Sequence, residues 1–390
     1  MENDTSFDAV KHRKKQRTKN NLKKLLLFLL IAAFCGYLYL ERDAWIPKLE
    51  GIGSRYEAIT QNDGTLAEGN FPLSITRNAE YQAAVVEDNL FILNASYLYL
   101  YSLHGDLKDT RQLAYSKPIM KSNENFALLY ENGGTRFRVD RQSRNLYAKN
   151  MDSPIITGAI SPDGVVALVT ESDLYSCVLQ VFDKNGKKLY TRNCIERLSD
   201  IAFTADSAGC VFTELSAADG DVVTTMKCIQ FDETDFVWES EALTTLSLAV
   251  SLTASNYTCV IGDTTCAYYN QKGQLDSMYP YVGSLKSYAM EAGNAAILVW
   301  DEEKRETKLV LFEGSATEPV EITVNGDAKA VQVYGDRVYM MNAETIIAYN
   351  FSGKAVATVN LDSAYDSFLK KDNYLFLLRY DKIDRVDFKE

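Results

Sequence analysis

Histidine is nearly absent from this chain, which has only His12 and His104 in 390 residues. A Ser-His-Asp catalytic device in the folded part would have to use His104, which lies in the turn-like run 103–106 and reads as a structural residue. The sequence has no Cys-x-x-Cys spacing of a zinc site, no phosphate-binding GxxxxGK loop and no dinucleotide glycine pattern. We therefore predict no catalytic, metal or cofactor residue and expect a protein that is not an enzyme.

Acidic residues offer no clear alternative chemistry. The run Asp219-Gly220-Asp221 is too short for a calcium loop. Glu302 and Glu303 are adjacent carboxylates in a charged segment, which favours a solvated turn over a general acid and base pair.

A recurring hairpin is the main feature that is present. Its clearest copy is the run 159–169, where two apolar segments flank Pro162-Asp163-Gly164. Proline fixes φ and glycine tolerates positive φ, so this tripeptide predicts a turn between two antiparallel strands. Similar turns are centred at 88, 124, 163, 206, 255, 293, 336 and 372, with spacings of 36 to 49 residues.

Each repeat also contains a second hairpin, best seen where Asn185-Gly186 separates two apolar runs. Two hairpins per repeat of about 40 residues give the four-stranded blade of a β-propeller. We predict an all-β, eight-bladed propeller over residues 70–390, with seven blades as the alternative. A pair of β-sandwich domains is the other architecture that short strands and frequent turns allow.

The last repeat ends after three strands, so another segment must supply the fourth. The apolar run 71–76 precedes the first repeat, and we expect it to pair with residues 385–388 and close the ring.

The N-terminus predicts a membrane anchor. Residues 1–24 carry eight basic and three acidic residues, which is typical of a disordered tail. Residues 25–40 are uncharged and apolar, and sixteen helical residues span ~24 Å of a membrane core that is ~30 Å thick. A cleaved signal peptide is the alternative, but no small-x-small site follows. Residues 41–69, punctuated by proline and glycine, read as a stalk.

Charge then sets the orientation and the class of partner. Basic residues before the anchor place the N-terminus in the cytoplasm and residues after it outside the cell. Without the tail, residues 25–390 hold 33 basic and 50 acidic residues, a net charge of −17. Such a surface repels nucleic acid and anionic polymers. We expect contact with the lipid bilayer through residues 25–40, a protein partner in the cell envelope, and no nucleic acid.

Six cysteines lie beyond the anchor and flank turns in pairs. A two-residue turn at Asn185-Gly186 places Cys177 opposite Cys194 as a non-hydrogen-bonded pair, with Cα atoms ~4.5 Å apart. A three-residue turn with Gly186 in a bulge would instead place Asn193 opposite Cys177.

The other two pairs follow the same reasoning. Cys259 and Cys266 flank Gly262-Asp263 as a hydrogen-bonded pair at ~5.5 Å, a less suitable geometry. Cys210 and Cys228 flank residues 218–220. All six are candidate disulfide residues in an external domain, and the alternative is that they are reduced, buried hydrophobes.

Tyrosine is abundant, with 24 residues, and Tyr97, Tyr99 and Tyr101 alternate along one predicted strand. Tyr279 and Tyr281 flank Pro280. Exposed rings of this kind could stack on sugars or anchor a peptide, but we expect them to fill the space between blades.

The basic tail, single anchor, stalk, Phe71-Pro72-Leu73-Ser74-Ile75 strand and repeats resemble a family of uncharacterised, membrane-anchored propeller proteins of Gram-positive bacteria. The repeats also resemble quinoprotein-like and WD-repeat propellers. A quinoprotein would need adjacent cysteines and regular tryptophans, whereas only Trp45, Trp238 and Trp300 occur and no two cysteines are adjacent. The expected function is a non-catalytic, surface-displayed scaffold that binds protein. The alternative is a binding module for a small molecule or glycan, and an enzyme using channel carboxylates ranks third.

Overall fold

The computed structural model of the chain describes residues 65–66, 69–75, 80–314, 318–324 and 326–388. The predicted tail 1–24, the predicted anchor 25–40 and most of the predicted stalk 41–69 lie outside these residues. No helix that could span a membrane occurs in the part of the chain that the structure describes.

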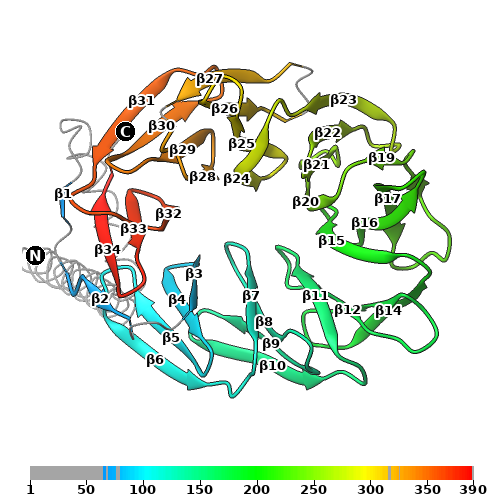
Figure 1. Cartoon of the computed structure of the whole chain (residues 1–390). Coiled ribbons are helices and arrows are strands. Elements are labelled where there is room, and N and C mark those ends of the chain that lie inside the picture. Colours follow the sequence, from blue (N-terminus) through cyan, green and yellow to red (C-terminus); the bar gives the residue numbers. More distant parts are fainter. Residues whose placement is uncertain (1–64, 67–68, 76–79, 315–317, 325, 389–390) are drawn as a thin grey trace, which may run out of the picture. The chain divides into compact units, whose positions relative to one another are not determined.

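The described strands form eight antiparallel sheets arranged as the blades of a propeller (Figure 1). Their order confirms the eight-bladed prediction over the seven-bladed one. Blade 1 contains β3 (Tyr81–Val86), β4 (Asn89–Asn94), β5 (Tyr97–Ser102) and β6 (Leu107–Gln112), and blade 2 contains β7 (Pro118–Ser122), β8 (Ala127–Glu131), β9 (Arg136–Arg141) and β10 (Arg144–Asn150). Blade 3 contains β11 (Ile155–Ile160), β12 (Val166–Thr170), β13 (Cys177–Phe182) and β14 (Lys188–Cys194). Blade 4 contains β15 (Arg197–Phe203), β16 (Gly209–Ala218), β17 (Asp221–Gln230) and β18 (Trp238–Glu239), and β19 (Leu243–Thr244) also pairs with β17.

The second half of the ring continues the same plan. Blade 5 contains β20 (Ser247–Leu252), β21 (Thr258–Gly262), β22 (Thr265–Tyr269) and β23 (Leu275–Pro280), and blade 6 contains β24 (Ser284–Glu291), β25 (Asn294–Asp301), β26 (Glu306–Phe312) and β27 (Val320–Val324). Blade 7 contains β28 (Ala330–Tyr334), β29 (Arg337–Met341), β30 (Thr345–Asn350) and β31 (Ala355–Asn360). Blade 8 contains β32 (Ser367–Lys371), β33 (Tyr374–Leu378) and β34 (Lys382–Asp387), and both β1 (Thr65–Leu66) and β2 (Leu73–Ser74) pair with β34.

The Pro-Asp-Gly hairpin forms as predicted. Ser161 N donates to Val165 O and Gly164 N donates to Ser161 O, at 2.8 and 3.0 Å, and Gly164 has a φ of +83°. Ile160 therefore stands opposite Val166, and the apolar runs become β11 and β12.

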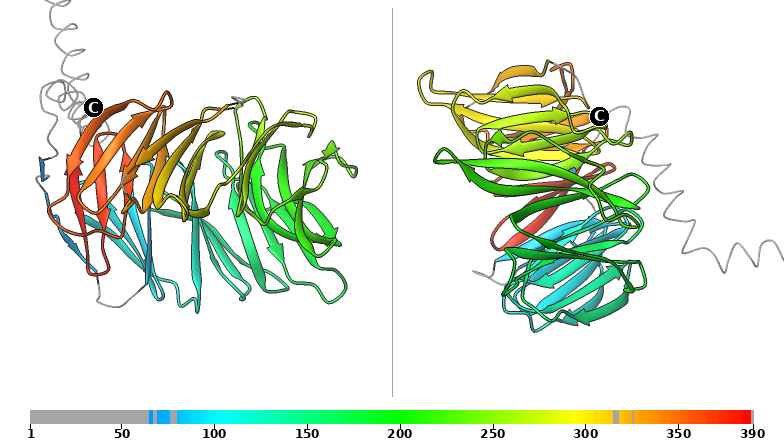
Figure 2. Two further views of the ribbon diagram at one scale, coloured as in Figure 1. Left: turned by 45° about the horizontal axis from the view of Figure 1, so that its top comes forward. Right: turned by 90° about the vertical axis from the view of Figure 1, so that its right-hand side faces the viewer.

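The hydrophobic core is divided into eight clusters, and each cluster joins two neighbouring blades. Between blades 2 and 3, for example, Phe137 and Phe182 pack with ring centroids 5.5 Å apart. Each blade is thus buried on two faces by its neighbours, which explains why the second strand of a blade is apolar along nearly its whole length. Figure 2 shows these packed sheets from two further directions.

Ring closure uses the N-terminal segment, as the sequence predicts, but in a different register. Leu73 and Ser74 pair with Ile383 and Lys382, whereas residues 71–76 were expected to pair with residues 385–388. That register places Leu73, which is 6% exposed, in the core between blades 8 and 1. The short strand β1, which falls in the predicted stalk, pairs with the other end of β34.

Candidate functional site

Strand direction divides the turns of the propeller between two faces. The four strands of each blade alternate in direction, so the turns between second and third strands share a face with the links from one blade to the next. We call this the cleft face, and the face with the first turn of each blade the turn face.

A wide cleft opens on the cleft face, where blades 8, 1 and 2 meet. It has a volume of about 810 Å³. Its polar lining includes Glu80, Ser116, Lys117, Asn132, Asp366 and Arg379, and its apolar lining includes Leu93, Pro118, Ile119 and Tyr380.

Side chains that reach backbone atoms fix the cleft walls. The Tyr81 hydroxyl donates to Arg379 O at 2.8 Å and so joins blade 1 to blade 8. Gln82 donates from Nε2 to Pro118 O at 2.8 Å and accepts from Met120 N at 2.9 Å, joining blade 1 to blade 2. Burial raises the pKa of Tyr81 to about 12, so its hydroxyl remains a donor at neutral pH. The cleft is therefore preformed.

The cleft rim carries both signs of charge beside an exposed ring. Arg379 pairs with Asp381 at 2.9 Å, and its guanidinium lies 5.3 Å from the centre of the Tyr380 ring. The Tyr380 side chain is 52% exposed, and Lys117 is exposed on the facing wall. Such a surface can pair with backbone groups and with charges of either sign.

A second polar feature lies along the innermost strands. Gln82, Asp200, Ser287 and Gln332 each accept a hydrogen bond from a backbone N–H of the next blade. Asp200 Oδ2 accepts from Val250 N at 3.0 Å and is the carboxylate among these four bridges. Burial raises the pKa of Asp200, and the positive charge of Lys121 opposes that rise.

The charge of this carboxylate also acts on tyrosines from two other blades. Burial raises the pKa values of Tyr130 and Tyr288, and the charge of Asp200 adds to both shifts. The Tyr288 side chain is 39% exposed. Asp200, Lys121 and Tyr288 thus lie on the innermost strands of blades 4, 2 and 6 and interact through their charges.

The turn face is held together by hydrogen bonds from one first turn to the next. Examples are Asn123 Nδ2 to Ser161 O at 2.8 Å and Ser207 Oγ to Asp163 Oδ2 at 2.9 Å. Many of its acidic side chains are therefore engaged in structure.

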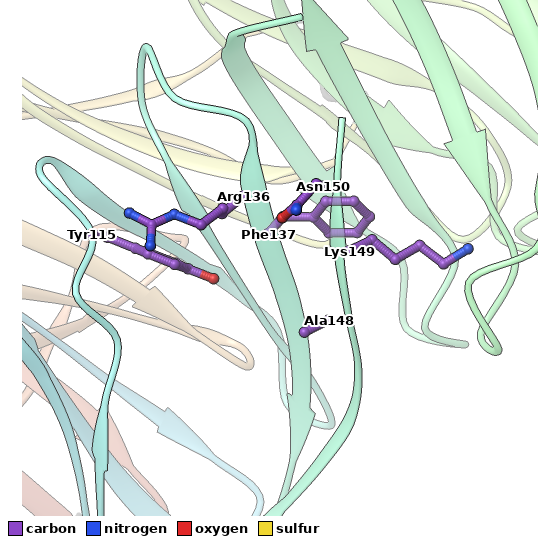
Figure 3. A pocket seen from close by; sticks show the side chains of 6 residues that line it. All are labelled: Tyr115, Arg136, Phe137, Ala148, Lys149 and Asn150. Atoms are coloured by element: carbon purple, nitrogen blue, oxygen red, sulfur yellow. The ribbon is translucent and has the colours of Figure 1, made fainter. Parts of the chain in front are cut away.

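A smaller pocket of about 270 Å³ lies on the outer part of blade 2 (Figure 3). Arg136 covers the Tyr115 ring at 5.0 Å and pairs with Glu131 at 3.0 Å, while Lys149 points away from this pair. Glu131 also accepts from Ser116 N, and the bonds from Arg136 and Ser116 lower its pKa to about 2. These contacts order a surface and assemble no reactive group.

The structure places Cys177 directly opposite Cys194, in the predicted register but for a different reason. Gly186 has a φ of +79° and Asn185 does not have positive φ, so the turn is not the type I′ turn that was expected. A bulge near Leu189 restores the register that this wider turn would have shifted.

These two thiols are buried, and each donates to a nearby backbone carbonyl: Cys177 Sγ to Glu196 O at 3.5 Å and Cys194 Sγ to Arg192 O at 3.7 Å. Their mutual interaction lowers the pKa of Cys177 and raises that of Cys194. In the structure both are free thiols, as are Cys210, Cys228, Cys259 and Cys266. That any pair forms a disulfide stays a prediction.

The predicted registers of the other two pairs are wrong. Cys266 stands opposite Ile261, because the turn falls one residue later than expected, so Cys259 is its diagonal neighbour with sulfurs 3.9 Å apart. Cys228 stands opposite Val211, so Cys210 and Cys228 point to opposite faces of blade 4 and enter different cores. A cross-strand bond between Cys210 and Cys228 has no geometric basis.

Most of the remaining candidate residues are packed as the sequence favoured, but Tyr97, which was expected between blades, is 36% exposed. His104 lies in an exposed turn, with Nδ1 3.2 Å from Arg385 Nη1. Tyr99 and Tyr101 pack between blades 8 and 1, and Tyr279 and Tyr281 pack between blades 5 and 6. Within the described residues, no three His, Cys, Asp or Glu side chains are arranged to hold a metal ion.

Sequence reasoning missed the cleft and Asp200. The cleft is built from loops of three blades that are far apart in the chain. Asp200 lies six residues before the centre of its turn, as Gln82 does, and comparing repeats at that position would have revealed the carboxylate.

Comparisons with known proteins agree with this architecture. The model of a protein family described as "Family of unknown function (DUF5711)" matches residues 68–388 of this chain. No curated protein matches the sequence.

Solved structures show the same fold at low sequence identity. BamB from Moraxella catarrhalis is 12% identical, with a TM-score of 0.55, over 83% of this chain and 100% of that one. Sqt1 from Saccharomyces cerevisiae is 11% identical, with a TM-score of 0.53, over 80% and 98%. The Cps50 (Swd1) propeller domain of Myceliophteria thermophila is 9% identical, with a TM-score of 0.51, over 71% and 99%. These similarities support the fold alone. The function has to be argued from the chain's own surface.

Proposed function

Since the chain belongs, over residues 68–388, to the DUF5711 family of unknown function, we propose a role from its own surface: a non-catalytic scaffold that binds a protein partner. The preformed cleft of about 810 Å³ between blades 8, 1 and 2 carries this proposal. Loops of three blades supply charges of both signs, backbone groups and the exposed Tyr380 ring, a combination typical of protein recognition.

A stable complex extends beyond the cleft. Specific protein interfaces bury roughly 800 Å² on each partner, so the partner would also cover neighbouring loops of the cleft face. We further propose that the basic tail and apolar segment 25–40 anchor the chain, with the propeller outside the cell and the partner in the cell envelope. The DUF5711 family membership supports the propeller part of this proposal, and the composition of residues 1–40 supports the anchor.

The group formed by Asp200, Lys121 and Tyr288 favours a second candidate, binding of a small molecule or glycan at the centre of the ring. A half-buried carboxylate, a lysine whose charge acts on it and a partly exposed phenol can together bond a hydroxyl-rich ligand. This candidate differs from the first in its location and in its ligand.

Affinity capture with the tagged full chain from its own membranes tests the scaffold. The double variant Tyr380→Ser and Lys117→Glu should lose the captured protein, while Leu107→Ser, an exposed residue at the turn-face end of β6, should keep it. Equal capture by the cleft variant would reject the cleft as the binding site. A glycan or small molecule that binds the wild type and the cleft variant but not Asp200→Asn would favour the second candidate.

A further inference from the structure

Three apolar side chains stand out on the cleft face at the junction of blades 3 and 4. Leu174 is 86% exposed, Ile195 80% and Tyr175 43%. Leu174 and Tyr175 lie in the turn between β12 and β13, and Ile195 lies in the link from blade 3 to blade 4. Apolar groups this exposed gain free energy when a partner covers them.

Hydrogen bonds fix the backbone segments that carry these three side chains. Ser176 N donates to Cys194 O at 3.1 Å, and Ser176 Oγ bonds Ile195 O, which ties the turn to the interblade link. Ser172 Oγ accepts from the backbone N–H groups of Leu174 and Tyr175. The apolar group is therefore held in place before a partner arrives.

The hairpin of β16 and β17 borders this group. Its strands pair from Gly209–Gln230 to Ala218–Asp221, whereas β15 pairs with β16 only as far as Leu215. Its exposed tip lies on the cleft face and carries Val222, which is 47% exposed. The hairpin therefore extends past Arg197, which follows the interblade link that carries Ile195.

The charge around this area is almost entirely negative. Exposed or half-buried carboxylates lie on the two blade 3 loops and on the hairpin tip, opposed by Arg197. They are Glu171, Asp173, Glu196, Asp219 and Asp221. Opposite charges across an interface direct association and set specificity.

We propose that this blade 3–4 surface, comprising Leu174, Tyr175, Ile195 and Val222 with the five carboxylates, binds a segment of a protein partner in which lysine or arginine alternates with apolar side chains. The proposal rests on the scaffold function above and adds the chemistry of the partner. The acidic border disfavours anionic lipid and also a second copy of the same surface, because both would bring like charges together.

A defined probe tests this chemistry on the full chain in detergent solution. The probe is a fluorescent peptide of sequence Lys-Leu-Leu-Lys-Leu-Leu-Lys, followed by anisotropy, and the counterpart has glutamate in place of lysine. The lysine peptide should bind about tenfold tighter, and added salt should weaken it. The double variant Leu174→Ser and Ile195→Ser should weaken binding about tenfold, while Leu275→Ser, an exposed leucine of outer strand β23, should not.

Four results would overturn the proposal. The first is equal binding of the two peptides, and the second is unchanged binding to the double variant. The third is binding that appears only after Lys11, Arg13, Lys14 and Lys15 are changed to glutamine, since the chain's own tail would then be the occupant. Vesicles with anionic lipid that compete through Leu174 and Ile195 would likewise replace the partner by a membrane.

The two proposals fail separately. If the cleft variant abolishes capture of the partner and the blade 3–4 variant neither abolishes it nor changes peptide binding, the scaffold stands and this inference is wrong. If no protein is captured by the wild-type chain, the scaffold is wrong, and peptide binding still reports on the blade 3–4 surface.

Discussion

Two buried thiols face each other in blade 3, and their proximity gives a first prediction at the scale of single residues. Cys177 and Cys194 are directly opposite, and both are almost fully buried. We expect a disulfide between them, because the proposed location outside the cell is an oxidising environment. Closing this short loop would stabilise the fold by about 3 kcal/mol in the chain-entropy description. Non-reducing peptide mapping should recover the two cysteines joined; free thiols or other pairings would refute the assignment.

A buried carboxylate of blade 2 gives a prediction of pH dependence. Arg136 and Ser116 hold the pKa of Glu131 at about 2, below its unfolded value of about 4.3. This contribution to stability is therefore full above about pH 4.3 and is lost as the pH falls toward 2. Glu131→Gln should lower the unfolding free energy by about 1 kcal/mol at pH 7.

Thermal unfolding followed from pH 7 to pH 2 checks this sign. The wild type and Glu131→Gln should converge in melting temperature at the acidic end. Glu302→Gln, an exposed carboxylate in a loop, serves as the control and should follow the wild type throughout. A constant difference between wild type and Glu131→Gln at all pH values would contradict the account.

Turn chemistry explains what single residues in the sequence could and could not reveal. Counting residues outward from a two-residue turn predicted that Cys177 would stand opposite Cys194. The turn is wider than expected, and a bulge compensates for the difference. The same reasoning failed at Cys259 because the turn lies one residue later. Side chains bonded to turn backbones, such as Asp183, determine these details, and a register count does not include them.

At the scale of elements, the hairpins and their repeat could be predicted from the sequence because each depends on local signals. Proline, glycine and alternating apolar residues mark the strand pairs, and the repeat length gives the blade. The register of β2 against β34 was not legible, because it depends on how Leu73 fits a core made by blades 8 and 1. The cleft was not legible either, since it joins loops almost 300 residues apart.

Ring closure yields a prediction for the element β2. Leu73→Ala should lower the unfolding free energy by about 3 kcal/mol, because it opens a cavity in the core that joins the last and first blades. Ser74→Ala, at the exposed neighbouring position, should have little effect. Urea titration of both variants makes the comparison, and deleting residues 70–77 should cause aggregation or a larger loss. An unchanged midpoint for the deletion would defeat the closure mechanism.

At the scale of the whole molecule, orientation across the membrane is a prediction from residues 1–40, which lie outside the described residues. The basic tail should remain in the cytoplasm and the propeller should be external. A cysteine introduced at Gly64 in the intact cell should react with an impermeant reagent, and one introduced at Asp8 should not. Labelling in the opposite pattern would reverse the orientation and the proposed location of the partner.

Binding of a protein through the cleft face is the central claim, and site-specific photocrosslinking tests it most directly. A photoreactive amino acid would replace Tyr380 on the cleft face or Asn185, an exposed turn residue on the turn face, in the full chain in its own cells. The account predicts a discrete protein adduct from position 380 that is lost when Lys117→Glu is added, and no such adduct from position 185. The absence of an adduct at 380, or the same adduct from both positions, would contradict it.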